Sequence, residues 1–340
     1  MRITTISHPR LVNCNYRSYQ PLMALEREGH TITVNRIDGP RYRESDLFAS
    51  DVVHIHRYAD DEVRQLVARL RASGIGIVWD NDDDESTTPR GNRLHREKAS
   101  GLNAMRTARA IREIVQLADV VTTPSVHLAD QYTRLGARDV RVLENYVADH
   151  YLRCHSRPHS GVVVGWLAGK EHKADYEGLG LESTFRRLLA ERPNVSITSI
   201  GLGLGLQSER YKHIDMLRWM TDLAPGIAEF DIGIAPLIDV PFNRARSNIK
   251  VKEYAAVGVP WLASPIGPYA RLGQAEGGRL VKDDEWLDSI FALVDDERRR
   301  RRLAKRCRKW VKAETVSRNA HRWHEVFEHA ASIAKSRLHA

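Results

Sequence analysis

The sequence has few cysteines and no long apolar run. Its 340 residues include three cysteines, Cys14, Cys154 and Cys307, which lie far apart and in no metal-ligand spacing. We therefore expect free thiols rather than a zinc site or disulfides, as in a reducing compartment. No stretch approaches the roughly 18 apolar residues of a membrane span, and the start lacks the apolar core of a secretory signal. A soluble, cytoplasmic protein is expected.

Most of the excess positive charge is confined to one segment. Residues 298–312 hold ten Lys or Arg residues and no acid, so subtracting ten from the net charge of +8 leaves about −2 elsewhere. Leu303, Cys307 and Trp310 recur at helical spacing, which predicts a helix with basic outer faces. Three interpretations stay open: a solvated helix, peripheral contact with an anionic membrane on its inner face, or a patch that steers phosphate-bearing substrates.

The length of the chain fits two domains of about 150 residues each. A polar, proline-containing segment at residues 153–160 separates two series of expected strands and helices. We therefore predict domains over residues 1–155 and 156–318. The order of strand, loop, helix and strand at the start is typical of a doubly wound α/β domain, in which ligands gather at the carboxyl ends of the strands.

The most informative stretch, residues 230–268, predicts a strand, a long loop, a helix and a second strand. Ser247 or Asn248 is expected to cap the helix, and Ser247, Lys250 and Glu253 recur every third residue along one stripe. The unpaired N–H groups of a helix start favour a phosphate, to which Lys250 would add a charge. Glu253 would accept hydrogen bonds from sugar hydroxyls. An ordinary βαβ unit with a solvated Lys and Glu is the alternative.

This stretch resembles the donor site of retaining GT-B glycosyltransferases of family four (glycosyl transferases group 1). The matching residues are Lys250, Glu253, Tyr254, Ala255, Ala256, Gly258 and Pro260. The resemblance implies an α/β chain of two Rossmann-like doubly wound domains facing a cleft, with a last helix over residues 319–340 that packs back on the first domain. It also implies a hexosyltransferase that moves a sugar from a UDP- or GDP-sugar to an acceptor hydroxyl with retention of anomeric configuration.

The resemblance assigns roles to residues of the second half. Glu253 would hold the ribose of the donor, and neither a metal nor another cofactor would be needed. Two departures affect the sugar and phosphate contacts: Ala245 stands where commoner members carry a second Glu, and Trp166 stands where the usual Arg falls. The cationic role toward the diphosphate is therefore divided among Lys170, His172 and Lys173, which follow a strand and a glycine. Further donor-binding candidates are Gly169, Gly201, Asn243, Ser247 and Asn248.

Acceptor candidates occur at strand ends of the first half. Arg17 follows the first strand, with a surface residue at a helix start as the alternative. Asp82 and Asp83 belong to an acidic run at residues 80–85, which is either part of the site or a solvated loop. Such runs can bind divalent cations with a nucleotide, but the GT-B resemblance argues against a metal here. The acceptor, a glycan, lipid or small molecule, is not specified.

Two other functions compete with glycosyl transfer. A catalytically idle nucleotide-sugar-binding module would explain Ala245 and Trp166. A glycosyltransferase that modifies nucleic acid would use residues 298–312 to follow phosphates. Contact with nucleic acid is the less favoured of these, because that basic segment contains one aromatic residue, Trp310.

Overall fold

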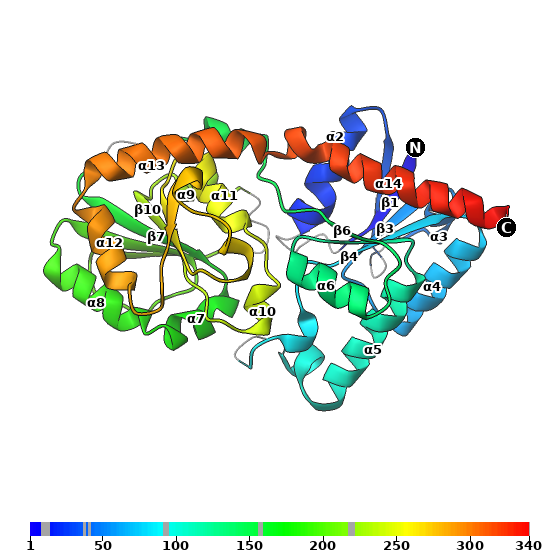
Figure 1. Cartoon of the computed structure of the whole chain (residues 1–340), viewed down its shortest axis with the longest axis horizontal. Coiled ribbons are helices and arrows are strands. Elements are labelled where there is room, and N and C mark those ends of the chain that lie inside the picture. The colour runs from blue at the N-terminus through cyan, green and yellow to red at the C-terminus, as the bar shows by residue number, and fades with distance from the viewer. Residues whose placement is uncertain are drawn as a thin grey trace.

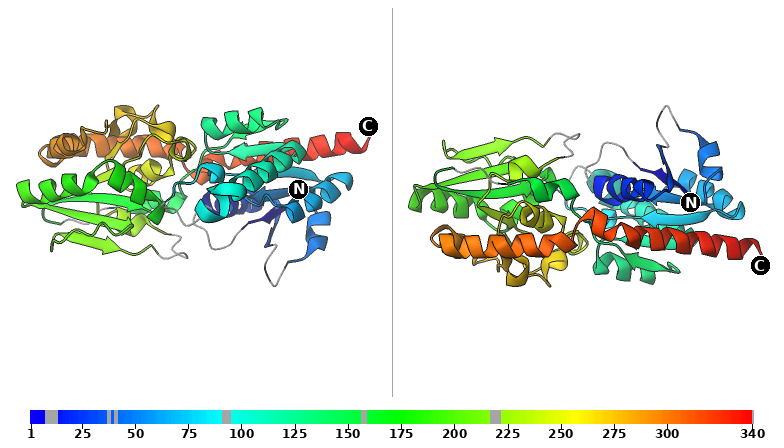
Figure 2. Two further views of the ribbon diagram at one scale, coloured as in Figure 1. Left: turned by 90° about the horizontal axis from the view of Figure 1, so that it is seen from below. Right: turned by 90° about the horizontal axis from the view of Figure 1, so that it is seen from above.

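The computed structural model of the protein describes residues 1–7, 14–36, 39, 42–90, 95–155, 159–216 and 222–339. It contains two parallel six-stranded sheets, each covered by helices, that lie one beyond the other along the long axis of the molecule (Figure 1). Figure 2 shows the same two halves from two further sides. The predicted α/β class with two doubly wound units is confirmed.

The first sheet has the strand order β2-β1-β3-β4-β5-β6, with every neighbouring pair parallel. Its strands are β1 (Arg2–Ile6), β2 (Thr31–Asn35), β3 (Val52–His56), β4 (Gly76–Asp80), β5 (Val120–Thr123) and β6 (Val140–Val142). The central strands β3 and β4 are buried along their whole length, as expected for a parallel sheet covered on both faces. The order reverses between β1 and β3, and such switch points place ligands beyond the carboxyl ends of the strands.

Helices and short helical turns accompany the sheet of this half. They are η1 (Asn15–Tyr19), α2 (Gln20–Arg27), α3 (Glu44–Phe48), α4 (Asp61–Ala72), η2 (Glu85–Thr87), η3 (His95–Ala99), α5 (Gly101–Leu117), α6 (Val126–Arg134) and η4 (Asp149–Arg153). In α4 the carboxylate of Asp60 accepts a hydrogen bond of 2.9 Å from the N–H of Val63, which satisfies a free donor of the first turn.

The second sheet has the order β12-β11-β10-β7-β8-β9, also parallel throughout. Its strands are β7 (Val162–Ala168), β8 (Val195–Gly201), β9 (Tyr211–Ile214), β10 (Ile232–Ala235), β11 (Trp261–Ala263) and β12 (Gly278–Leu280). Strand β9 was not expected from the sequence, because it lies at the sheet edge and has polar, partly exposed residues. The switch point of this sheet lies between β7 and β10.

The second half has its own covering helices and turns. They are η5 (Lys170–His172), α7 (Lys173–Gly178), α8 (Leu181–Glu191), α9 (Ala224–Ile227), α10 (Pro241–Arg244), α11 (Ile249–Ala256), η6 (Gly267–Tyr269), η7 (Gln274–Glu276), α12 (Trp286–Val294), α13 (Glu297–Trp310) and η8 (Val311–Ala313). Helix α13 is the basic helix expected from the sequence, and Leu303 and Cys307 are its buried residues.

The last helix, α14 (Val316–Leu338), returns to the first sheet and packs against α2 and β4 (Figure 1). Trp323 and Phe327 on α14 share a core cluster with Ile3 and Val52 of the sheet. The chain therefore crosses between the two halves twice. Residues 156–158, within the predicted domain border, lie outside the described residues.

A buried lysine of α11 joins the two crossing segments. The Nζ atom of Lys252 lies 2.6 Å from a carboxylate oxygen of Glu144 and 2.8 Å from one of Glu314, and its side chain is fully buried. Glu144 and Glu314 belong to the outgoing and the returning segment, respectively. Beside them, the N–H of Val147 donates to the carbonyl oxygen of Glu314 at 3.0 Å. One ammonium group thus links both crossings to the helix that carries Lys250 and Glu253.

Candidate functional site

Polar side chains gather where the carboxyl ends of the two sheets meet. The second half contributes the turn after β7, the loop after β10 and the first turns of α11, all at its switch point. The first half contributes the ends of β3 and β4. Direct hydrogen bonds connect the two sides: Ser125 Oγ donates to the carbonyl oxygen of Ala245 at 2.8 Å, and Asn145 Nδ2 donates to Ser247 Oγ at 3.0 Å. The topology therefore predicts a ligand site at this junction.

Glu253 is buried on α11 and receives two phenolic hydrogen bonds. The hydroxyl of Tyr16 donates to Oε1 at 2.5 Å, and the hydroxyl of Tyr151 donates to the same oxygen at 3.3 Å. Burial raises the pKa of Glu253 to about 7, although the hydrogen bonds from both tyrosines and the charge of Lys250 oppose that rise. The carboxyl group is therefore poised to change its protonation near neutral pH.

Lys250, His172 and Asp175 form a chain of hydrogen bonds. Lys250 Nζ lies 2.9 Å from His172 Nε2, and His172 Nδ1 lies 2.7 Å from Asp175 Oδ2. The carboxylate of Asp175 can only accept from Nδ1–H, which leaves Nε2 to accept from the lysine. Burial, and after it the charges of Lys250 and Arg246, lower the pKa of His172 well below its ordinary value. His172 is therefore a neutral orienting group for Lys250.

The ammonium of Lys250 is destabilised in the absence of a ligand. Burial, and after it the charge of Arg246, lower the pKa of Lys250 to about 7. Arg246 donates from Nη2 to Glu171 Oε1 at 3.0 Å. Burial by itself raises the pKa of Glu171, but the charge of Arg246, the largest opposing cause, helps to bring it down to about 2. An anion placed beside Lys250 would restore its positive charge.

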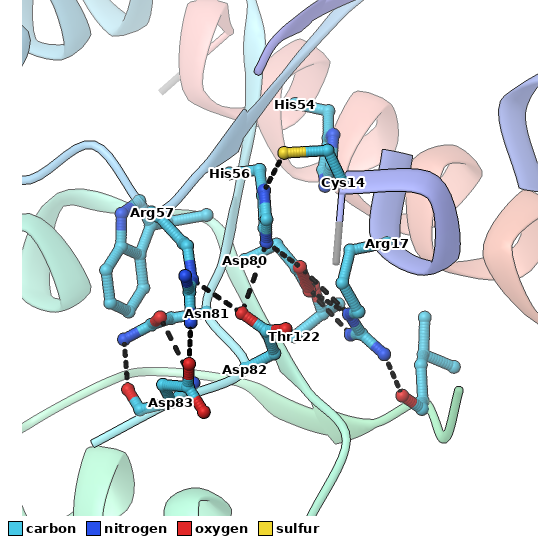
Figure 3. A network of polar contacts seen from close by, with 12 residues as sticks. Cys14, Arg17, His54, His56, Arg57, Asp80, Asn81, Asp82, Asp83 and Thr122 are labelled. Atoms are coloured by element: carbon cyan, nitrogen blue, oxygen red, sulfur yellow. Dashed lines mark hydrogen bonds and ion pairs between the residues drawn. The ribbon is translucent and has the colours of Figure 1, made fainter. Parts of the chain in front are cut away.

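On the opposite side, Arg57 holds both predicted acceptor carboxylates (Figure 3). Its Nε donates to Asp82 Oδ1 at 2.6 Å, and its Nη2 bonds to Asp83. Burial raises the pKa of Asp83 to about 6, and Asp82 adds to that rise against the attraction of Arg57. Arg57 has a φ of 68°, a left-handed conformation that no other non-glycine residue of the described ranges adopts. The two carboxylate contacts of Arg57 offset this backbone strain. The position after β3 is therefore conformationally constrained.

His56 supports the same cluster from β3. Its Nε2 lies 3.3 Å from Asp82 Oδ1, and its Nδ1 lies 3.5 Å from the Cys14 sulfur (Figure 3). Burial alone would lower the pKa of His56, but the hydrogen bonds to Asp82 and Cys14 and the charges of Asp82 and Asp80 raise it to about 9. The imidazolium therefore keeps Asp82 ionised and in place.

Arg17 lies beneath this cluster rather than in it. Its fully buried side chain pairs with Asp80, with Nη2 lying 2.6 Å from Oδ1, and bonds to the carbonyl of Leu143 and to Asn145 Oδ1. Its guanidinium also lies 4.9 Å from the centre of the Trp323 ring. Arg17 is therefore not the surface residue of the alternative interpretation, and its contact with an acceptor stays a prediction. Arg17 ties the strand ends to α14.

The three residues predicted to share the cationic role behave differently. His172 is buried and neutral, so it is not a cation. Lys173 is exposed, and its Nζ lies 3.6 Å from a carboxylate oxygen of Glu177 on the same helix. Lys170 is exposed at the start of η5. Of the cations considered from the sequence, Lys250 and Lys170 therefore remain.

Most predicted donor-binding residues shape the backbone around the site. Asn243 donates to Asp175 Oδ1 at 2.7 Å and to the carbonyl of Ile238, so it braces the loop after β10. Gly201 has a φ of 102°, and a Cβ there would lie 2.3 Å from the carbonyl oxygen of Ala168, so a side chain is excluded at the end of β8. Gly169 leads directly into η5.

The helix cap differs from the sequence expectation. Asn248 is the N-cap residue of α11 but forms no side-chain capping bond. Its Nδ2 instead donates to Glu144 at 3.1 Å, while Ser247 accepts from Asn145. The first N–H groups of α11 therefore have no side-chain cap from Asn248, as an anion-binding helix start requires.

Sequence reasoning did not assign roles to four residues of this junction. They are Tyr16, Tyr151, Arg246 and Lys252. Their partners lie in other elements, and no local pattern in the sequence links them. Within the described ranges, no helix is long and apolar enough to cross a bilayer. In the same part of the chain, no group of three or more His, Cys, Asp or Glu residues is arranged to hold a metal ion.

Comparison with known proteins identifies the architecture. No family model matches the chain, and no curated protein matches its sequence. Sucrose-phosphate synthase from Thermosynechococcus elongatus superposes with a TM-score of 0.67 at 14% identity, covering 96% of this chain and 98% of that one. HepE from Anabaena, in complex with UDP and glucose, gives a TM-score of 0.67 at 12% identity, with 96% and 99% covered. An α-glucosyltransferase bound to UDP and a 13-mer DNA containing an HMU base gives 0.67 at 10% identity, with 97% and 99% covered. The chain has the GT-B fold.

Two positions distinguish this GT-B chain from the sequence pattern that it resembles. Ala245 is fully buried and belongs to a core cluster of the first half, so the place of the usual Glu is filled by a contact between the halves. Trp166 is buried beside Tyr176, with ring centres 6.2 Å apart. At 10–14% identity the comparisons establish the fold, whereas function depends on the residues of the site.

Proposed function

We propose that the protein is a glycosyltransferase that moves a sugar from a UDP- or GDP-sugar to an acceptor hydroxyl with retention of anomeric configuration. The observation that carries the proposal is the position of Lys250 and Glu253 on one stripe of α11, with Glu253 buried and Lys250 half-buried, at the switch point of a GT-B second domain. The stripe offers a cation near the helix start and a carboxylate behind it. These groups match the diphosphate and the ribose of a nucleotide sugar.

In this proposal Glu253 binds the nucleoside. Both phenolic hydrogen bonds fall on Oε1, which leaves Oε2 to accept from ribose hydroxyls. Tyr16 lies in η1 and Tyr151 in η4, both in the first half, whereas Glu253 lies on α11 of the second half. The nucleoside contact is therefore oriented across the junction.

Lys250 and the free N–H groups at the start of α11 stabilise the leaving group, with Lys170 as an outer cation. The bond between the sugar C1 and the β-phosphate oxygen breaks, and its electron pair leaves with the phosphate. The acceptor oxygen forms the new bond to C1 on the same face, and its proton passes to the departing phosphate oxygen. Because negative charge grows on that phosphate, preorganised donors around it lower the barrier. His172 and Asp175 keep the ammonium aimed.

Asp82 and Asp83 are proposed to hold acceptor hydroxyls. They follow the end of β4, on the side of the junction that faces the second half, and the charge of Arg246 from that half acts on Asp83. Arg57 and His56 fix the two carboxylates, so that an acceptor meets oriented hydrogen-bond acceptors. A catalytically idle nucleotide-sugar-binding module remains the rival function, since Ala245 and Trp166 replace residues of the resembling pattern.

Thermal unfolding with UDP, GDP, ADP and TDP tests the proposal. A ligand that binds only the native state raises stability by mass action, so UDP or GDP is expected to raise the melting temperature. The matching sugar nucleotide, followed by NMR of the anomeric proton in the product, then separates transfer with retention from binding alone. No shift with any of the four nucleotides would contradict the proposal.

We also propose that the basic helix contacts an anionic membrane from the cytoplasmic side. Five exposed cations follow one another at spacings of four, three, four and three residues: Arg298, Arg302, Lys305, Lys309 and Lys312. We call this row the cationic stripe. Within the described part of the chain, none of the five forms an ion pair. From Arg298 to Lys309 the row spans about 17 Å at 1.5 Å per residue. Anionic lipid head groups offer a matching surface, and the stripe contains no aromatic side chain for stacking on nucleic acid bases.

A further inference from the structure

The position where the resemblance places an arginine cannot supply a cation in this chain. Trp166 is 1% exposed and packs in the core of the second half. Its ring points among Tyr176 and His172, with centres 6.2 and 5.9 Å away. A diphosphate that relied on Lys250 alone would have one close cation for two negatively charged groups. Another cation from the same junction is therefore required.

Arg246 has the geometry of such a cation. It lies in the loop between α10 and α11, two residues before the N-cap of α11. Its Nη2 is fixed by Glu171 at 3.0 Å, and its guanidinium carbon lies 5.5 Å from the centre of the Phe242 ring. Its other terminal nitrogen, Nη1, is shielded from solvent and has no hydrogen-bond partner in the described part of the protein. A charged donor that is shielded from solvent and has no partner is energetically unfavourable, which indicates a ligand at this atom.

The surroundings of Arg246 place it at the reacting end of the site. Its charge acts on Lys250, His172 and Asp175 in the second half and on Asp83 in the first. It therefore lies between the lysine of the leaving-group site and the carboxylates of the acceptor side. Asp83 and Glu171 balance its charge from the two halves. Nη1 is thus surrounded by protein groups rather than by open solvent.

We infer that Nη1 of Arg246 binds an oxygen of the donor's β-phosphate and replaces the cation lost at Trp166. The inference rests on the proposed function. Glu171 holds the guanidinium through Nη2, so that Nη1 remains directed at the phosphate. As the bond between C1 and the phosphate oxygen breaks, charge grows on the phosphate and this hydrogen bond strengthens. Arg246 and Lys250 then form the pair of cations that stabilises the leaving group.

Comparison of a nucleoside diphosphate with its nucleoside tests the inference. Calorimetry of the full chain measures its affinity for UDP and for uridine, and for GDP and for guanosine. The ratio of the two affinities in each pair is the preference for the diphosphate. For the pair that binds, Arg246→Gln is expected to lose about 10- to 100-fold of this preference while affinity for the nucleoside stays unchanged. Arg246→Lys should recover part of the loss. Gln keeps an N–H for Glu171, and retained nucleoside binding reports that the variant is folded.

Arg244→Gln is the matched control. Arg244 lies two residues earlier, is exposed and pairs with Asp239 at 2.6 Å, so its loss should leave the diphosphate preference at the wild-type value. If Arg246→Gln keeps the wild-type preference for the diphosphate over the nucleoside, the inference is overturned while the proposed function stands. A wild-type protein that binds none of the four compounds overturns the proposed function and the inference with it.

Discussion

The phenolic oxygen of Tyr16 lies 2.5 Å from a carboxylate oxygen of Glu253, although 237 positions separate the two residues in the chain. Tyr16 belongs to the first half and Glu253 to the second. The carboxylate proposed to hold the ribose is therefore oriented by the opposite domain. Nucleoside binding and the contact between the halves should depend on each other.

Tyr16→Phe should shift the pH dependence of nucleotide binding. The phenol stabilises the ionised carboxylate, and its removal should raise the pKa of Glu253 above about 7 by roughly one unit. Because the ionised form accepts from ribose hydroxyls, the midpoint for UDP or GDP affinity should move upward by that amount in calorimetric titrations. Tyr42→Phe, far from the site, should keep the wild-type midpoint. Identical midpoints in wild type and Tyr16→Phe would refute this coupling.

Glu253→Gln should change the pH dependence of stability with a defined sign. The folded pKa of Glu253, about 7, is above the ordinary 4.5, so the folded state retains a proton that the unfolded state has released. The stabilisation of the folded state by the protonated carboxyl group is complete below pH 4.5. It is lost as the pH rises to about 7. Relative to the Gln variant, the unfolding free energy of wild type should fall by roughly 3 kcal/mol over that interval. Urea unfolding at several pH values checks this, and parallel curves would contradict it.

Lys250→Ala should be folded and nearly inactive. Removing one preorganised donor to a leaving group typically lowers turnover about 100- to 1,000-fold. The measurement is turnover with the donor that thermal unfolding identifies. Lys173→Ala is the control, because Lys173 is exposed and pairs with Glu177. Turnover in Lys250→Ala equal to that of the control would exclude the assigned role.

Lys252→Met should destabilise the junction without entering the site. The change leaves Glu144 and Glu314 facing each other across the two crossing segments. Since both carboxylates are partly exposed, we expect a loss of about 2 kcal/mol, below the value for a fully buried pair. Lys212→Met removes the exposed pair with Glu229 and should cost about 1 kcal/mol or less. Equal unfolding free energies for the two variants would show that Lys252 is not a structural link.

Charge reversal on the cationic stripe should weaken vesicle binding. Lys305→Glu with Lys309→Glu is expected to weaken co-sedimentation with phosphatidylglycerol vesicles about tenfold or more, and raised salt should release the wild-type protein. The control pair, Arg186→Glu with Arg187→Glu on α8, changes the net charge equally at exposed positions away from the stripe. The membrane contact would be ruled out if the wild-type protein did not co-sediment with these vesicles. It would also be ruled out if the control variant lost as much co-sedimentation as the stripe variant.

Much of the fold follows from local sequence patterns. The apolar runs of the central strands predict a parallel sheet because both faces are covered, and the stripe through Trp323 and Phe327 predicts a helix packed on a core. Strand β9 has no such apolar run and was not predicted, because an edge strand does not bury its side chains on both faces. The stripe of Lys250 and Glu253 is visible because helical spacing alone aligns them.

The remainder of the site depends on contacts between distant segments. Nothing near Arg17 in the sequence indicates that Asp80, 63 positions later, will pair with it, and nothing near His172 indicates that Lys250, 78 positions later, will lie beside it. Arg246 and Arg244 look alike in the sequence, yet one is fixed with a shielded donor and the other is solvated. These differences arise from burial and charge in the assembled junction.

A crystal structure of the protein with UDP or GDP bound, whichever stabilises it, tests the central claim most directly. We predict the diphosphate at the start of α11 within hydrogen-bond distance of Lys250, and the ribose hydroxyls on the carboxylate of Glu253. A nucleotide bound elsewhere, with these two side chains untouched, would contradict the account.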